Sequence, residues 1–138
     1  MIGKGDIAYE RALIYFREGH NCAQSVIMAV SDAEGEEVPL ELITGTAGFS
    51  GGIGFSGDAC GSVSGGVIAM GVFLSRKGVK QEAIPKAGAR FLRWFKEEFG
   101  VSNCYELREG KSFRSTKGKC GEYTARTARK VVDIIESY

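Results

Sequence analysis

Residues 58–75 read DACGSVSGGVIAMGVFLS and carry one charged side chain, Asp58, at the start. The uncharged remainder is seventeen residues long, whereas a helix that crosses a bilayer needs about 20 predominantly apolar residues. We therefore predict a central helix that is capped by Asp58 and buried within the protein. Four glycines on this helix would let another backbone approach it closely: Gly61, Gly65, Gly66 and Gly71.

The segment just before this helix is rich in glycine. Residues 45–57 read GTAGFSGGIGFSG, with six glycines in thirteen positions and a formal G-x-G-x-x-G at Gly52, Gly54 and Gly57. A dinucleotide site would need a preceding strand and an acidic residue about 20 positions later, but the surroundings are helical and Lys77 stands at that distance. We predict instead a loop that brings backbone amides close to Cys60.

The rest of the chain shows helical periodicity and no sustained alternation of apolar and polar residues. Caps and apolar spacing predict helices over 6–18, from Asn21 through Val30, and over 39–44, 85–99, 102–109 and 120–138. Residues 1–138 are thus predicted to form one all-α domain. We expect a bundle of five to six helices in which the glycine-rich loop leads into the buried central helix.

Composition narrows the functional classes. Eighteen Lys and Arg side chains face seventeen Asp and Glu side chains, so the formal charge is +1 and gives no overall attraction to nucleic acid. The N-terminal residues are charged throughout and contain no apolar signal core. We therefore expect a cytoplasmic protein that is neither a membrane protein nor a nucleic-acid-binding one.

Four cysteines, Cys22, Cys60, Cys104 and Cys120, are the candidate catalytic residues. Structural disulfides are disfavoured in the cytoplasm, so cysteines there more often serve catalysis, redox chemistry or metal binding. Each of the four is predicted to lie in the first turn of a helix. Unpaired backbone N–H groups and the helix dipole favour thiolate at such positions, and thiolate is the reactive form.

These residue types leave three functions open. In the first, the thiols carry out thiol–disulfide or electron-transfer chemistry, with Cys60 central. In the second, the four cysteines hold zinc, iron or an iron–sulfur cluster, although no C-x-x-C pair is present. His20, two residues before Cys22, is then a further candidate ligand, or else a cation that closes the first helix. In the third, the thiols are inert apolar side chains of a non-catalytic helical module.

Taken together, these motifs resemble a known family. Residues 19–26 read GHNCAQSV, the glycine-rich loop leads into CGSVSG at 60–65, and lone cysteines follow at 104 and 120. This arrangement resembles the C_GCAxxG_C_C family of redox-active proteins, with Ser62 where the family motif has alanine. The resemblance implies redox activity through the four cysteines and a redox partner associated with a transporter. The substrate, the cysteine pairing and the oligomeric state, a homo-oligomer included, stay open.

Overall fold

The fold is all-α. A computed structural model describes residues 2–138, and within that range it contains seven α-helices, two short 3-10 segments and no strand. The sequence predicted a bundle of five to six helices, and each segment over which a helix was predicted, including the short ones at 39–44 and 102–109, contains a helix in the structure. The helices are α1 (Lys4–Arg17), α2 (Cys22–Glu34), α3 (Leu40–Thr44), α4 (Gly61–Arg76), α5 (Ile84–Phe99), α6 (Cys104–Leu107) and α7 (Lys117–Glu136).

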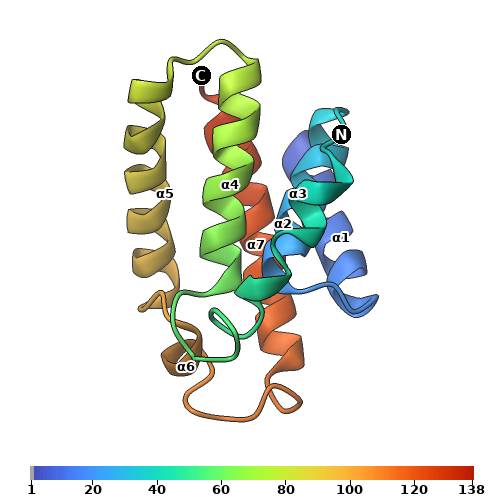
Figure 1. The fold of residues 1–138 in the computed structure, drawn as a ribbon, viewed down its shortest axis with the longest axis vertical. Helices are drawn as coiled ribbons and strands as arrows, with labels where there is room; N and C mark the ends of the chain where they lie inside the picture. The colour runs from blue at the N-terminus through green and yellow to red at the C-terminus, as the bar shows by residue number, and fades with distance from the viewer. Residues whose placement is uncertain (1) are drawn as a thin grey trace.

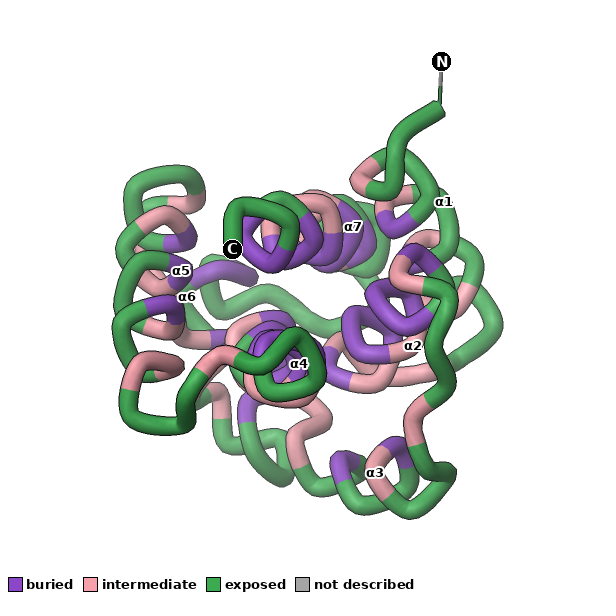
Figure 2. The backbone as a smooth tube through the Cα atoms, turned by 90° about the horizontal axis from the view of Figure 1, so that it is seen from above, coloured by how far each residue is buried: buried purple, intermediate pink, exposed green. Residues whose placement is uncertain are grey.

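The long helices pack side by side around α7 (Figure 1). This helix contacts α1, α2, α4 and α5, and α2 also contacts α4. Viewed from above, the buried faces of these helices turn toward one another, whereas their outer faces are exposed (Figure 2). None of the helices within residues 2–138 combines the length and the apolar character needed to span a bilayer. The helix predicted over residues 58–75 is present as α4, which buries one face and leaves Val67 45% exposed.

Local capping explains where several helices begin. Asn21 caps α2 as predicted: its Oδ1 accepts from the Gln24 amide at 2.8 Å, and the Gln24 side chain accepts from the Asn21 amide at 3.2 Å. Other boundaries differ from the prediction. The N-cap of α4 is Cys60 rather than Asp58, because the Asp58 carboxylate accepts from the adjacent Ala59 amide instead.

Two further helix starts also differ by one to three residues. The N-cap of α6 is Asn103 rather than Ser102, since the Asn103 side chain accepts from the Glu106 amide at 2.8 Å. The last helix, α7, begins at Lys117, three residues before the predicted start at Cys120.

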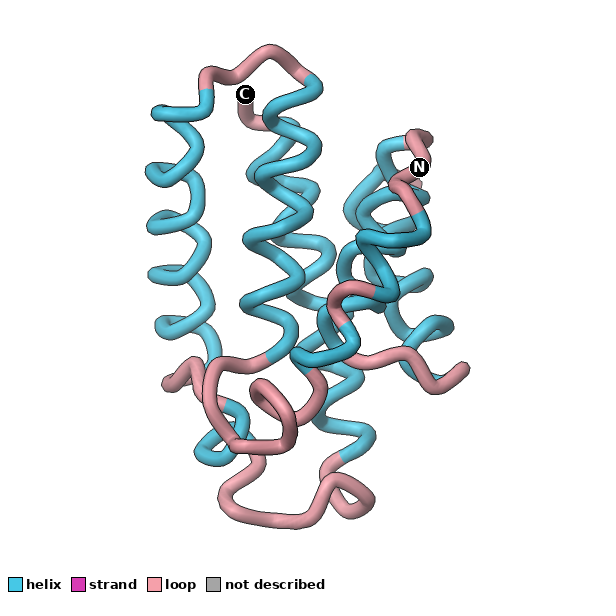
Figure 3. The backbone as a smooth tube through the Cα atoms, viewed as in Figure 1, coloured by secondary structure: helices cyan, strands magenta, loops and turns pink. Residues whose placement is uncertain are grey.

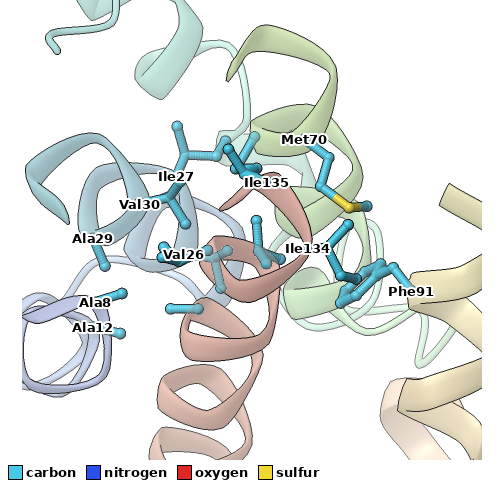
Figure 4. Close-up of a cluster of buried hydrophobic side chains, with 14 of the residues drawn as sticks. Ala8, Ala12, Val26, Ile27, Ala29, Val30, Met70, Phe91, Ile134 and Ile135 are labelled. Carbon is cyan, nitrogen blue, oxygen red and sulfur yellow. The ribbon is translucent and has the colours of Figure 1, made fainter. Parts of the chain in front are cut away.

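Glycines on α4 allow close packing against α2 and α5. A Cβ at Gly65 would lie 2.6 Å from the Ala23 carbonyl oxygen on α2, and one at Gly66 would lie 2.5 Å from the Phe91 ring. The same prediction is wrong for Gly71, where a Cβ would meet nothing within 4 Å. The core contains large apolar side chains from α2, α4, α5 and α7, among them Ile27, Met70, Phe91, Ile134 and Ile135 (Figure 4).

The glycine-rich segment forms an irregular loop below the bundle. It begins with a 3-10 turn, Ala47–Phe49, and continues through five consecutive residues, 51–55, with φ between 57° and 75°. Two of these five are not glycine: Ile53 and Phe55. Left-handed backbone is uncommon for such residues and costs roughly 1–2 kcal/mol each. This loop, α6 and the segment before α7 gather at one end of the molecule (Figures 1 and 3).

Candidate functional site

All four cysteines line one cavity at the loop end of the bundle. The cavity has a volume of about 330 Å³. Cys22 is the first residue of α2, Cys60 is the N-cap of α4, Cys104 is the first residue of α6 and Cys120 is the fourth residue of α7. Positions 38, 44 and 16 residues apart in the chain thus meet at one site. All four thiols are free.

Backbone contacts join the segments that carry Cys60 and Cys104. Ala59 and Asn103 form an isolated antiparallel bridge. On either side of it, the Cys60 amide donates to the Ser102 carbonyl at 2.8 Å and the Cys104 amide donates to the Asp58 carbonyl at 2.6 Å. These two cysteines are therefore held on neighbouring pieces of backbone.

The glycine-rich loop is held against both Cys22 and Cys104. The side-chain amide of Asn21, the residue before Cys22, donates to the Thr46 carbonyl at 3.2 Å and to Ser50 Oγ at 3.0 Å. At the other side of the cavity, a Cβ at Gly52 would lie 2.7 Å from the Cys104 Cβ. The loop needs glycine at position 52 because it packs directly on the cysteine.

The predicted thiolate environment is absent at three of the cysteines. Burial raises the pKa of Cys22, raises the pKa of Cys60 to about 11 and also raises the pKa of Cys120. The Thr124 hydroxyl lowers the pKa of Cys22, and the backbone and hydroxyl of Ser62 lower that of Cys60, but burial outweighs both. Cys120 is also not at a free helix start, since its amide donates to the Thr116 carbonyl at 2.8 Å.

The three remaining thiols influence Cys22 as well. Negative charge on Cys60, Cys120 or Cys104 would each raise the pKa of Cys22 further. The four sulfurs are therefore close enough that ionisation of one disfavours ionisation of another. Such a set favours one thiolate among neutral thiols rather than four thiolates.

Cys104 has a different environment, because a cation contacts its sulfur. Arg108 Nε donates to Cys104 Sγ at 3.3 Å. Arg108 is only 7% exposed, its guanidinium lies 3.8 Å from the centre of the Phe113 ring, and it also donates to the Lys111 carbonyl. Within residues 2–138 no carboxylate forms an ion pair with Arg108. A buried guanidinium at a sulfur stabilises the negatively charged form of that sulfur.

Sequence reasoning did not identify Arg108. Among the basic side chains that precede Cys120 in the chain, Arg114, Lys117 and Lys119, only Lys117 lines the cavity. The signal that could have revealed Arg108 is its spacing, since residues i and i+4 face each other on a helix. The predicted helix over 102–109 contained both Cys104 and Arg108.

His20 lines the cavity beside Cys22. Its ring packs edge-on against Tyr15, with centroids 5.8 Å apart, and its amide donates to the Tyr15 carbonyl at 3.2 Å. Within the described part of the chain, no group of three or more His, Cys, Asp or Glu side chains is arranged to hold a metal ion. Metal binding by the four cysteines, with or without His20, stays a prediction.

Five Phe and Tyr rings also line the cavity. The rings come from α1, the glycine-rich loop, the segment before α7 and α7 itself: Phe16, Phe49, Phe55, Phe113 and Tyr123. Phe55 and Phe113 pack edge to face, with centroids 5.6 Å apart. The cavity therefore offers an apolar binding volume next to the thiols. Residue spacing does not predict this volume, because the rings come from segments that are distant in the chain.

Comparison with known proteins identifies one family. The family model described as "Putative redox-active protein (C_GCAxxG_C_C)" matches residues 20–134, a range that contains all four cysteines and Arg108. Neither the search of curated proteins nor the search of solved structures gave a match.

Proposed function

The chain belongs to the C_GCAxxG_C_C family of redox-active proteins, and from this premise we propose that it carries out thiol–disulfide exchange inside the cysteine-lined cavity. One observation carries the proposal: four cysteines from four different helices line a single cavity. Such exchange needs two thiols that can meet and a site that admits the substrate. A reducing compartment such as the cytoplasm would keep the thiols ready to react.

In this proposal Cys104 is the attacking thiol. Support comes from Arg108, whose buried guanidinium donates to the Cys104 sulfur, whereas burial raises the pKa of the other three thiols. The Cys104 thiolate attacks one sulfur of a substrate disulfide. The substrate S–S bond breaks, one half leaves as a thiolate that takes up a proton, and the other half stays bound to Cys104 as a mixed disulfide.

Cys60 is the resolving thiol. The support is the backbone bridge that joins the segments of Cys60 and Cys104. Cys60 loses its proton and attacks the Cys104 sulfur, which expels the second half of the substrate as a thiol. The protein has then lost two electrons and two protons to form one disulfide, and the substrate has gained both to become two thiols. The reverse reaction with a dithiol reductant restores the protein.

Single cysteine variants test these roles. Reduced protein is mixed with a small disulfide without oxygen, and the adducts are identified by intact-mass spectrometry. We expect Cys60→Ser to accumulate a mixed disulfide on Cys104, whereas Cys22→Ser and Cys120→Ser complete the exchange as the wild type does. Cys104→Ser should lose the reaction. An unchanged rate in Cys104→Ser would overturn the assignment, and four unreactive thiols in the folded wild type would support the inert helical module instead.

Arg108 variants test the source of reactivity at Cys104. We expect Arg108→Gln to slow alkylation of Cys104 by iodoacetamide about tenfold at pH 7, the effect of losing one charge-assisted hydrogen bond. Arg108→Lys should restore part of the rate. The matched control is Arg114→Gln, because Arg114 is exposed and does not line the cavity. Equal rates in wild type and Arg108→Gln would remove the reason to prefer Cys104.

Metal binding is the competing proposal, because four thiols line the one cavity and thiols are good ligands for zinc, iron and iron–sulfur clusters. It requires the cysteines to rearrange, since no group of three or more ligand side chains in the described part of the chain is arranged to hold a metal ion. Elemental analysis of protein purified anaerobically without chelators separates the two. One or more metal atoms per chain, lost on Cys→Ser substitution, would favour the metal site. A value near zero with reactive thiols would favour exchange.

A further inference from the structure

The charges around the cavity are of one sign. Three side chains in its lining are basic or can become so, His20, Arg108 and Lys117, and no Asp or Glu side chain of the described chain lines it. Nearby on the same helix, Lys119 does not line the cavity and is instead paired with Glu109 at 2.9 Å. The cavity is thus a place where positive charge lies next to an apolar volume without a carboxylate to balance it.

Lys117 is the cation that remains available there. It is exposed, it lines the cavity, and within residues 2–138 it forms no ion pair. Arg108, by contrast, is buried and already donates to the Cys104 sulfur. An anionic group that enters the cavity can therefore pair with Lys117 without breaking an existing contact.

The start of α7 adds donors at the same point. Lys117 is the first residue of this twenty-residue helix, and the N-cap residue Thr116 makes no side-chain cap hydrogen bond. The Thr116 hydroxyl donates to the Ser112 carbonyl instead. The first N–H groups of a helix have no partner within it. They can therefore donate hydrogen bonds to an anion that lies beside the Lys117 ammonium.

The aromatic side chains of the cavity favour a ligand that has an apolar body in addition to its anionic group. Phe55 and Phe113 stand edge to face, and Phe49 and Tyr123 also line the cavity. Rings of this kind pack well against a planar apolar group. A volume of about 330 Å³ is in the range of a small-molecule site and far too small for a folded partner.

We infer that the cavity binds a small organic anion that has a flat, apolar body, with the body among the aromatic rings and the anionic group at Lys117 and the first turn of α7. One part of this inference rests on the proposed function: the substrate is then an aromatic disulfide with an anionic group, and its S–S bond lies beside Cys104. The binding itself requires no thiol chemistry.

Binding of matched probes tests the inference directly. The probes are 2-naphthoate, which is anionic, and 2-naphthamide, which has nearly the same shape and no charge, titrated into the reduced wild-type protein by calorimetry. We expect 2-naphthoate to bind at least about tenfold more tightly, the effect of one charge-assisted hydrogen bond. Saturating 2-naphthoate should also slow alkylation of Cys104, since the bound 2-naphthoate and the Cys104 thiol share the same cavity.

Two lysine variants locate the charge. Lys117→Gln should lose most of the preference for 2-naphthoate and leave 2-naphthamide binding unchanged. Lys119→Gln is the matched control on the same helix turn, because Lys119 is paired with Glu109 and does not line the cavity. It should keep the preference.

The outcomes separate this inference from the proposed function. Equal binding of the two probes, or a preference that survives Lys117→Gln, would overturn the anion site, and no binding of either would overturn the cavity as a ligand site. Neither result depends on cysteine reactivity, because 2-naphthoate undergoes no exchange. Conversely, a protein that binds 2-naphthoate but does not react with disulfides would retain the ligand site and lose the proposed exchange.

Discussion

The two ends of the bundle are built from the same helices but differ in what they bury. At the packed end, α2, α4 and α7 contribute side chains such as Ile27, Met70 and Ile134, all fully enclosed and all apolar (Figure 4). At the cysteine end, the starts of the same helices surround a cavity lined by thiols, a buried guanidinium and aromatic rings. The packed end contributes stability, and the cysteine end holds groups whose burial costs free energy.

The cysteine end also contains strained backbone. Five consecutive residues of the glycine-rich loop have positive φ, Ile53 and Phe55 among them. Strain of this kind tends to occur at functional sites, where the surrounding structure holds it in place. Here the starts of α2 and α4, to which the loop is attached, provide that support. The two ends should therefore respond differently to substitution.

The largest effect is expected at the packed end. Phe91→Ala should lower the free energy of unfolding by about 3–5 kcal/mol, because it removes a fully buried ring that packs on Gly66 of α4. Urea unfolding followed by circular dichroism measures this change. If the two ends are energetically separate, Cys104 in the folded Phe91→Ala variant should be alkylated at the same rate as in the wild type. Short pulses of alkylation under native conditions measure this rate.

A different result would show that the two ends are energetically coupled. If Phe91→Ala changes the native alkylation rate of Cys104 more than about twofold while the protein stays folded, the cavity depends on packing of the core. A loss of stability below about 1 kcal/mol, well under the usual cost for a buried ring, would show that the packed end collapses around the missing side chain.

An intermediate effect is expected from titration of the cysteine end. The pKa of Cys60 is raised to about 11 in the folded protein, whereas an unfolded cysteine titrates near 8.5. The unfolded chain therefore loses this proton first as the pH rises. As a result, the free energy of unfolding decreases as the pH rises from about 8.5 to about 11. The slope from this thiol is at most about 1.4 kcal/mol per pH unit. Burial of Cys22 and Cys120 adds to it in the same direction.

Unfolding curves of the reduced protein between pH 8 and 10 measure this slope. Cys60→Ala should make it shallower, because the variant lacks one of the titrating thiols. Met70→Leu is the control at the packed end and should leave the slope unchanged. A slope that stays the same in Cys60→Ala would show that Cys60 titrates alike in the folded and unfolded chains.

The sequence predicted the helices well at both ends of the bundle and the cavity at the cysteine end poorly, for a physical reason. Helix starts such as Asn21 and the apolar face that holds Phe91 depend on residues close in the chain, so spacing reveals them. The cavity depends on contacts between distant segments, which spacing does not record. Helix ends alone favour thiolate at the cysteines. Burial, which is set by the tertiary fold, acts in the opposite direction on the pKa of Cys60 and is the larger effect.

The smallest effect is expected in the glycine-rich loop, at Ile53. Its φ of 63° is unfavourable for a β-branched residue by about 1–2 kcal/mol, and glycine removes this strain but adds about 0.5–1 kcal/mol of backbone entropy to the unfolded chain. Ile53 is 48% exposed, so its side chain loses little burial. Ile53→Gly should therefore raise the free energy of unfolding by up to about 1 kcal/mol. Gly51→Ala is the opposite control, because its Cβ would lie 2.4 Å from the Phe55 ring. If Ile53→Gly instead destabilises the protein as Gly51→Ala does, the Ile53 side chain contributes packing that outweighs its backbone strain, and the loop is a stabilising part of the fold like the packed end.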